Sequence, residues 1–233
     1  MSRSATGKVL FCVATILVCV GCRKHEAPRE QVARTAGSAQ QVEDIPVPRT
    51  SGPIACNGKL DEPDWLRATR TGAFVAANGK GPARPMSEAR LLHDDKFLYL
   101  GLYAADEDIH PAVAAHDGPV WTGDAFSVRV FAPTNVRIDM SPSGVVTDAK
   151  VGPPVDPSWE SGTVLGVDMD GTPNDASDDD EEWIVEAAIP LASLCGDGAC
   201  SDLRVELSRC DTPKNGRRVC ASWGGPSTRL RLQ

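Results

Sequence analysis

The stretch DAFSVRVFAPTNVRIDM, residues 124–140, decides which fold the chain can adopt. Side chains of an extended strand point alternately to its two faces. Apolar residues take every second position on either side of the turn at 133–135: Phe126, Val128, Val130, Val136, Ile138 and Met140. Because Ser127, Arg129 and Arg137 fall between them, the stretch predicts two neighbouring strands with an apolar inner face and a polar outer face.

Similar short strands are expected along the rest of the chain, in five further runs: 96–104, 183–189, 203–210, 219–223 and 228–232. The first run is apolar on both faces, as expected for a strand at the centre of a sheet. Gly, Pro, Asn and Asp separate the runs, and no long helical periodicity follows residue 50. The pattern is typical of an all-β fold, an antiparallel β-sandwich of the jelly-roll or immunoglobulin-like type.

The first 22 residues have the layout of an export signal. Arg3 and Lys8 precede an uncharged apolar run that is too short to span a bilayer, as in a secretory signal peptide. The run ends in Val-Gly-Cys, which resembles a bacterial lipobox with Cys22 as the lipidated residue, and ordinary cleavage is the alternative. We therefore expect an exported lipoprotein at the bacterial cell envelope, in the periplasm or on the cell surface, that contacts the membrane only through its lipid.

Residues 23–50 contain few large apolar side chains, so they predict a flexible linker. Residues 51–233 have a suitable length for one domain. That part holds 17 Lys and Arg against 28 Asp and Glu, a formal net charge of −11. Such an acidic domain argues against nucleic acid or an anionic membrane surface as its partner.

Five cysteines follow Cys22, and disulfides are the usual state of cysteines in an exported protein. We expect one disulfide between Cys195 and Cys200 and a second between Cys210 and Cys220, so that Cys56 is left over or pairs with another chain. A zinc site is the alternative, but there are no Cys-x-x-Cys pairs or nearby histidines to favour it.

Five segments carry motifs that occur together, and in this order, in one known family. They are IACNGKLDEPDW (54–65), LLHDDKFLYLGLYAADEDI (91–109), VWTGDAFSV (120–128), VRIDMSPSGVVTDA (136–149) and the stretch 170–194. The ordered series resembles family 9 carbohydrate-binding modules and covers nearly all of residues 54–233. This resemblance implies a β-sandwich that binds a saccharide, such as a cell-wall polysaccharide, without catalysis.

The resemblance also implies a sugar site around Trp121. In the family two tryptophans clamp a pyranose ring while polar side chains bind its hydroxyl groups, and the C–H faces of sugars stack well on aromatic rings. Trp121 matches the first clamp tryptophan, and Arg137 matches an arginine that binds hydroxyl groups. Ser127 and Ser208 stand where the family has longer polar side chains.

The second clamp tryptophan of the family has no counterpart in this chain. The segment ASWGGPSTRLRL (221–232) runs straight into the last expected strand, without the long loop that carries this residue. Trp159 is the candidate replacement, so two interpretations stay open. Trp121 is either a ligand platform or a structural anchor that covers the edge of the core.

The stretch DMDGTPNDASDDDEE (168–182) holds eight carboxylates and no basic residue. Oxygen ligands suit calcium, which relatives of the family hold, and five residues here could supply them: Asp168, Asp170, Asn174, Asp175 and Asp178. The spacing differs from that of an EF-hand loop. A solvated acidic loop is the alternative to a calcium site.

The sequence offers little that favours an enzyme. No nucleophile elbow, His-Glu-x-x-His motif or phosphate-binding loop is present, so we expect no catalysis. Two other roles remain beside saccharide binding. One is a structural or protein-interaction domain that has lost the sugar site, and the other is a haem-binding relative with Met140 and His116 as available ligands.

Overall fold

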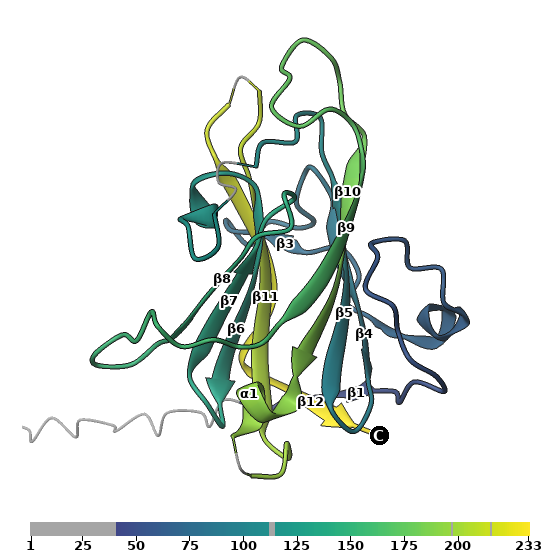
Figure 1. Ribbon diagram of the computed structural model, residues 1–233, viewed down its shortest axis with the longest axis vertical. Helices are drawn as coiled ribbons and strands as arrows, with labels where there is room; N and C mark the ends of the chain where they lie inside the picture. Colours follow the sequence, from purple (N-terminus) through teal and green to yellow (C-terminus); the bar gives the residue numbers. More distant parts are fainter. Residues whose placement is uncertain (1–40, 112–114, 197, 215) are drawn as a thin grey trace, which may run out of the picture. The chain divides into compact units, whose positions relative to one another are not determined.

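The computed structural model describes residues 41–111, 115–196, 198–214 and 216–233, and these form an all-β sandwich of two sheets (Figure 1). The predicted signal peptide, Cys22 and the first part of the predicted linker lie outside the described residues. Among the described helices, none is both long enough and apolar enough to cross a membrane.

The larger sheet has seven strands, and most of its pairs are antiparallel. Its order is β1 (Glu43–Val47), β12 (Val219–Leu232), β11 (Leu203–Asp211), β6 (Ala125–Ala132), β7 (Val136–Met140) and β8 (Val146–Lys150), with β3 (Val75–Ala76) also paired to β12. The 124–140 stretch thus forms two adjacent strands, β6 and β7, as its alternation predicts. The two runs expected at 219–223 and 228–232 are parts of the single strand β12.

The smaller sheet has five strands. Its order is β2 (Thr69–Arg70), β4 (Ser87–His93), β5 (Phe97–Ala105), β10 (Glu182–Pro190) and β9 (Val164–Asp170). β5 lies at its centre, and it is apolar on both faces because one face packs in the main core and Tyr99 on the other packs against Trp65. Three short helices complete the described elements: η1 (Pro63–Arg67), η2 (Val120–Thr122) and α1 (Leu191–Cys195).

The predicted linker extends too far. Residues 43–47 form strand β1, which pairs in parallel with the end of β12. Val47 is fully buried, so this short segment adds apolar surface to the core although it begins with Glu43 and Asp44. The folded unit therefore includes residues 43–47, which precede residue 51.

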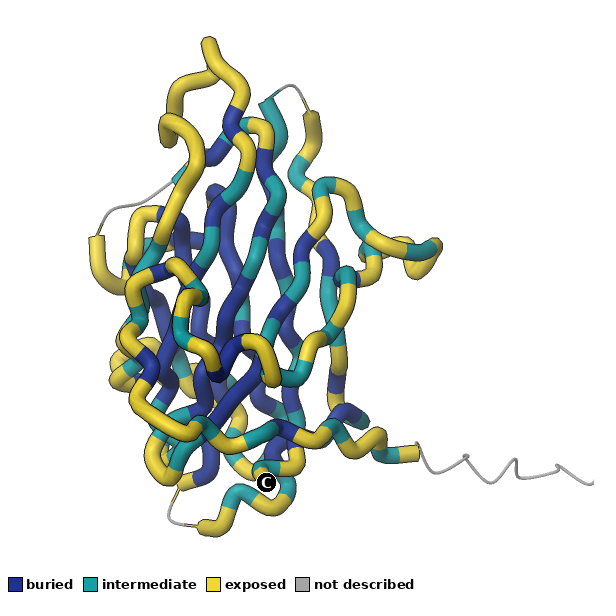
Figure 2. Tube along the Cα trace, turned by 90° about the vertical axis from the view of Figure 1, so that its right-hand side faces the viewer, coloured by how far each residue is buried: buried dark blue, intermediate teal, exposed yellow. Residues whose placement is uncertain are grey.

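The main core lies between the two sheets, and Figure 2 shows the buried segments following the strands. The alternation in β6 and β7 is confirmed, because all six apolar residues of this pattern are buried. Trp183 and Phe126 form a central aromatic contact with ring centroids 4.9 Å apart.

The outer face of the five-stranded sheet is covered by the segment around η1. Trp65 packs there with Leu92 and Tyr99 in a second, smaller core, and its Nε1 donates a hydrogen bond of 2.8 Å to the buried Glu186. The segment passes so close to the sheet that a Cβ on Gly166 would lie 2.2 Å from the Cys56 carbonyl oxygen. This segment covers part of that outer face, while Glu88, Arg90 and Tyr103 of the same sheet stay partly exposed.

Both predicted disulfides are present. Cys195–Cys200 closes the loop after α1, and Cys210–Cys220 joins β11 to β12 at positions directly opposite each other. Cys56 forms no disulfide with another described cysteine of this chain.

Candidate functional site

The outer face of the seven-stranded sheet presents polar side chains in rows that run across the strands. Strand register places Ser222, Ser208, Ser127, Asp139 and Thr147 side by side on five neighbouring strands. The next row contains Glu206, Arg129 and Arg137. We call the surface formed by Ser127, Arg129, Arg137, Asp139, Glu206, Ser208 and Ser222 the polar face.

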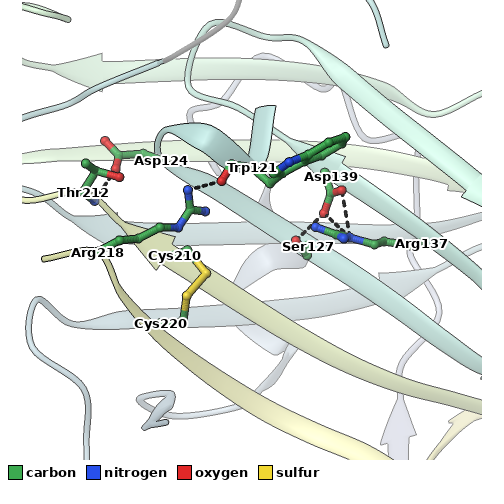
Figure 3. Close-up of a disulfide and its surroundings, with 9 residues drawn as sticks. All are labelled: Trp121, Asp124, Ser127, Arg137, Asp139, Cys210, Thr212, Arg218 and Cys220. Atoms are coloured by element: carbon green, nitrogen blue, oxygen red, sulfur yellow. Dashed lines mark hydrogen bonds and ion pairs between the residues drawn. A yellow bond between two sulfur atoms is a disulfide. The ribbon is translucent and has the colours of Figure 1, made fainter. Parts of the chain in front are cut away.

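Trp121 stands at one end of the polar face. It lies in the one-turn helix η2, directly before β6, and it has a relative exposure of 45%. The guanidinium carbon of Arg137 lies 5.6 Å from the centroid of the indole ring, within the range of a cation–π contact (Figure 3). The structure therefore brings Trp121 and Arg137 together at the surface instead of sealing the indole inside the core.

Asp139 links the residues beneath Trp121. Its carboxylate accepts hydrogen bonds from the Ser127 hydroxyl and from the Arg137 Nε, the latter at 2.9 Å (Figure 3). The pKa of Asp139 is raised because the group is buried, although Ser127 and Arg137 act in the opposite direction. These contacts hold Arg137 in place while 43% of its side chain stays accessible to a ligand.

The Trp121 loop is fastened at several points to the sheet. Arg218, from the β11–β12 connection, donates a hydrogen bond to the Trp121 carbonyl oxygen (Figure 3). Thr147 of β8 donates from its hydroxyl to the Gly118 carbonyl oxygen at 2.5 Å. Backbone and side-chain contacts thus position the ring without burying it.

Asp124 anchors the base of the same loop. It is fully buried and accepts hydrogen bonds from the backbone N–H groups of His110 and Thr212, at 2.6 and 2.7 Å. Burial raises the pKa of Asp124 to about 7, and the neighbouring Asp106 and Asp211 add to the effect, while the two backbone hydrogen bonds oppose it. A carboxyl group that joins three segments near Trp121 therefore changes charge close to neutral pH.

The other residues of the predicted sugar site have different surroundings. Ser208 lies directly opposite Ser127 in the strand register, so it belongs to the polar face. Trp159 is partly buried and packs against the main core, as does Trp223. The described residues therefore place one exposed tryptophan at the polar face, and Trp159 has a packing role.

The predicted calcium ligands are spread along a strand and a loop. Asp168 and Asp170 are exposed on β9, and Asp175 accepts hydrogen bonds from the hydroxyl and the N–H of Ser177. In the described part of the chain, no three of the predicted carboxylates converge. Asp178 contributes only its carbonyl oxygen to Lys214, and the backbone N–H of Asn174 donates to the Ile109 carbonyl oxygen. This arrangement does not fit a preformed calcium site, and calcium binding there stays a prediction.

Sequence reasoning missed several residues that shape the site. Asp139 could have been found from the alternation that placed Arg137 outward, because it is two residues further along the same strand. Arg218 and Asp124 gave no comparable signal, since their contacts are made across long sequence separations.

No protein-family model matches the chain, and no curated protein matches its sequence. Solved structures do match. A family 9 carbohydrate-binding module from Caldicellulosiruptor kristjanssonii in complex with cellotriose has a TM-score of 0.55 and 13% identity, over 82% of this chain and 95% of that one. The same module in complex with glucose gives a TM-score of 0.54 and 13% identity, over 82% and 97%.

A third match is a candidate carbohydrate-binding protein from Bacteroides uniformis. Its TM-score is 0.62 with 13% identity, over 83% of this chain and all of the other. At this identity the comparisons establish the fold alone. The chain has the β-sandwich fold of family 9 carbohydrate-binding modules, as the ordered motifs predicted.

Proposed function

We propose that this chain is a non-catalytic saccharide-binding domain that holds its ligand against Trp121 on the polar face. The observation that carries the proposal is the exposed indole ring beside Arg137, Asp139 and Ser127. A pyranose can place a C–H face on the indole, and its hydroxyl groups need both donors and acceptors, which the polar face supplies.

The ligand contacts proposed here favour modest affinity. With Trp159 packed against the core, a sugar ring would stack on one aromatic side chain rather than between two. Ser127 and Ser208 are short, so part of the hydrogen bonding to the ligand would pass through water. We further propose that the domain acts outside the cytosol at the cell envelope, tethered by the lipidated Cys22, and this rests on the sequence of residues 1–22.

The test is a titration of the full chain with cello-oligosaccharides and other cell-wall oligosaccharides, followed by tryptophan fluorescence and calorimetry. Trp121→Ala should lower the affinity by at least about tenfold, which corresponds to about 1.4 kcal/mol. Trp121→Phe should keep part of the binding, because a smaller aromatic face remains. Leu66→Ala is the matched control, since Leu66 is 90% exposed but lies on η1, which covers the other sheet.

Equal binding by the wild type and Trp121→Ala would refute this site. If no glycan binds and the wild type instead captures one defined envelope protein, the domain is an interaction module, the second role considered above. Haem binding has less support, because Met140 is fully buried in the main core and its sulfur is not available as a ligand.

A further inference from the structure

A second candidate site lies at the open side of the sandwich, where the edge strands of the two sheets meet. β8 is an edge of the seven-stranded sheet and β9 is an edge of the five-stranded sheet. A cavity of about 460 Å³ lies between them, lined by Val146 and Asp148 on one side and Leu165 on the other. His116 and Glu160 also line this cavity, and each comes from a different loop.

Three potential ligand atoms converge in these loops. The Nε2 of His116 lies 3.2 Å from the Glu160 carboxylate and 3.6 Å from the Asp117 carboxylate. The ligand atoms of the three residues all lie within 4.8 Å of one another. An ion pair among these three side chains would give the same spacing without a metal.

Asp148 is a further carboxylate at this cavity. It lines the same cavity and has a relative exposure of 4%. One carboxylate oxygen accepts a 2.8 Å hydrogen bond from the Ser161 N–H, next to Glu160, but the other, Oδ1, is buried without a partner. A buried carboxylate oxygen without a partner is costly, and a cation bound in the adjoining cavity would lower that cost.

We propose that His116, Asp117 and Glu160 bind a divalent transition-metal ion of the zinc type, with Asp148 as an outer carboxylate. One imidazole nitrogen with carboxylate oxygens is a common ligand set for such ions, whereas calcium takes oxygen ligands alone. Three carboxylates against one neutral imidazole give the cavity the negative charge that such an ion requires.

The ion would join two loops that the sheets leave separate. The loop that contains His116 is held to β8 through the Asp117 N–H and the Val146 carbonyl oxygen, 3.2 Å apart, and it leads directly to Trp121. Glu160 belongs to the loop between β8 and β9. Bound metal therefore cross-links the loop that leads to Trp121 to the loop between β8 and β9.

The test uses the metal-stripped full chain with Co²⁺ as a spectroscopic probe and Zn²⁺ in calorimetry. One equivalent of Co²⁺ should give visible d–d absorption without a thiolate charge-transfer band, and Zn²⁺ should displace it. His116→Gln and Glu160→Gln should each lower zinc affinity by at least about tenfold, and Asp148→Asn by a smaller factor. His110→Gln and Glu107→Gln are exposed controls outside the cluster and should bind like the wild type.

Thermal unfolding distinguishes loss of the metal site from loss of the fold. Without metal, all variants should melt at similar temperatures. When Zn²⁺ is added, the Tm should rise only in proteins with an intact site. Wild-type zinc affinity in His116→Gln would overturn the proposal. So would a thiolate charge-transfer band that alkylation of the cysteines removes, since the metal would then be bound by cysteine. If the wild type binds no metal, His116 forms an ion pair only.

Discussion

Trp121 leaves almost half of its side chain in solvent, although an indole is among the largest apolar groups that a protein can bury. The hydrophobic effect alone would favour placing it in the core, so other contacts must hold it outside. Arg218 fixes its carbonyl oxygen, and Arg137 lies against its ring above the buried Asp139. These contacts fix the ring at the surface, where it can stack on a ligand as the proposed saccharide site requires.

The pH dependence of stability should reflect Asp124 at the base of the Trp121 loop. Its pKa is raised to about 7, so the folded state favours the protonated form. The contribution of this group to stability is therefore complete below about pH 4 and is lost as the pH rises through about 7. The pKa of Asp211, raised to about 6 mainly by burial, acts in the same direction.

We expect the Tm of the wild type to fall as the pH rises from about 5 to about 8. The change of Tm with pH should be smaller in Asp124→Asn. Asp124→Asn should also be less stable overall, because an amide nitrogen faces one of the two backbone N–H donors. Melting curves at closely spaced pH values measure the slope separately from this constant loss. An unchanged slope in Asp124→Asn would show that another group titrates.

Among the structural elements, the β11–β12 hairpin connects the disulfide to the site. Cys210 and Cys220 are direct partners in the register, and Arg218 lies two residues before Cys220. Replacing both cysteines by Ser should lower stability by about 2–4 kcal/mol and weaken saccharide binding, because Arg218 then holds the Trp121 loop less firmly.

The second disulfide provides the matched control for this prediction. Replacing Cys195 and Cys200 by Ser should also destabilise the protein, but it should leave the affinity of the folded protein unchanged, since this pair closes the loop after α1, away from the hairpin. Calorimetry below the melting range of both variants separates the two effects. Equal affinities in the two double variants would mean that the hairpin does not control the site.

The elements also show which features of the fold could be predicted. Strands with strict alternation, such as β6 and β7, were predicted within one residue, because one buried face imposes a period of two. β1 was missed because only Val47 of its five residues is buried, and its stability comes from pairing with β12. β9 was missed because it is an edge strand in which four of the seven residues are exposed and no apolar alternation occurs.

Some residues of the candidate site could be predicted from the sequence, and others could not. Alternation predicted that Arg137 and Ser127 share one face, and the order of motifs placed Trp121 beside them. Register across β11, which places Ser208 next to Ser127, depends on pairing between distant segments and followed from the resemblance alone. The position of Trp159 depends on how a loop folds back on the core, which no local pattern encodes.

At the scale of the whole molecule, the sandwich buries charge at one end of its core. Arg209 points inward from β11 and makes ion pairs of 2.7 Å with both Asp106 and Asp211. The Trp183 Nε1 also donates to Asp106, at 3.0 Å, so the network reaches across to the smaller sheet. This polar cluster connects the two sheets. It lies beside Asp124, at the base of the loop that carries Trp121.

Arg209→Met should therefore destabilise the protein strongly. Removing the guanidinium leaves Asp106 and Asp211 as buried carboxylates without a cation, and breaking a buried pair of this kind costs about 3–5 kcal/mol. Lowering the pH should recover part of the loss, because protonation removes the unpaired charge. Arg204→Met, which removes the partly exposed pair between Arg204 of β11 and the preceding Asp202, should cost about 1 kcal/mol or less at any pH. Chemical denaturation of both variants at about pH 5 and pH 8 measures the difference, and equal losses in the two variants would contradict a structural role for the buried cluster.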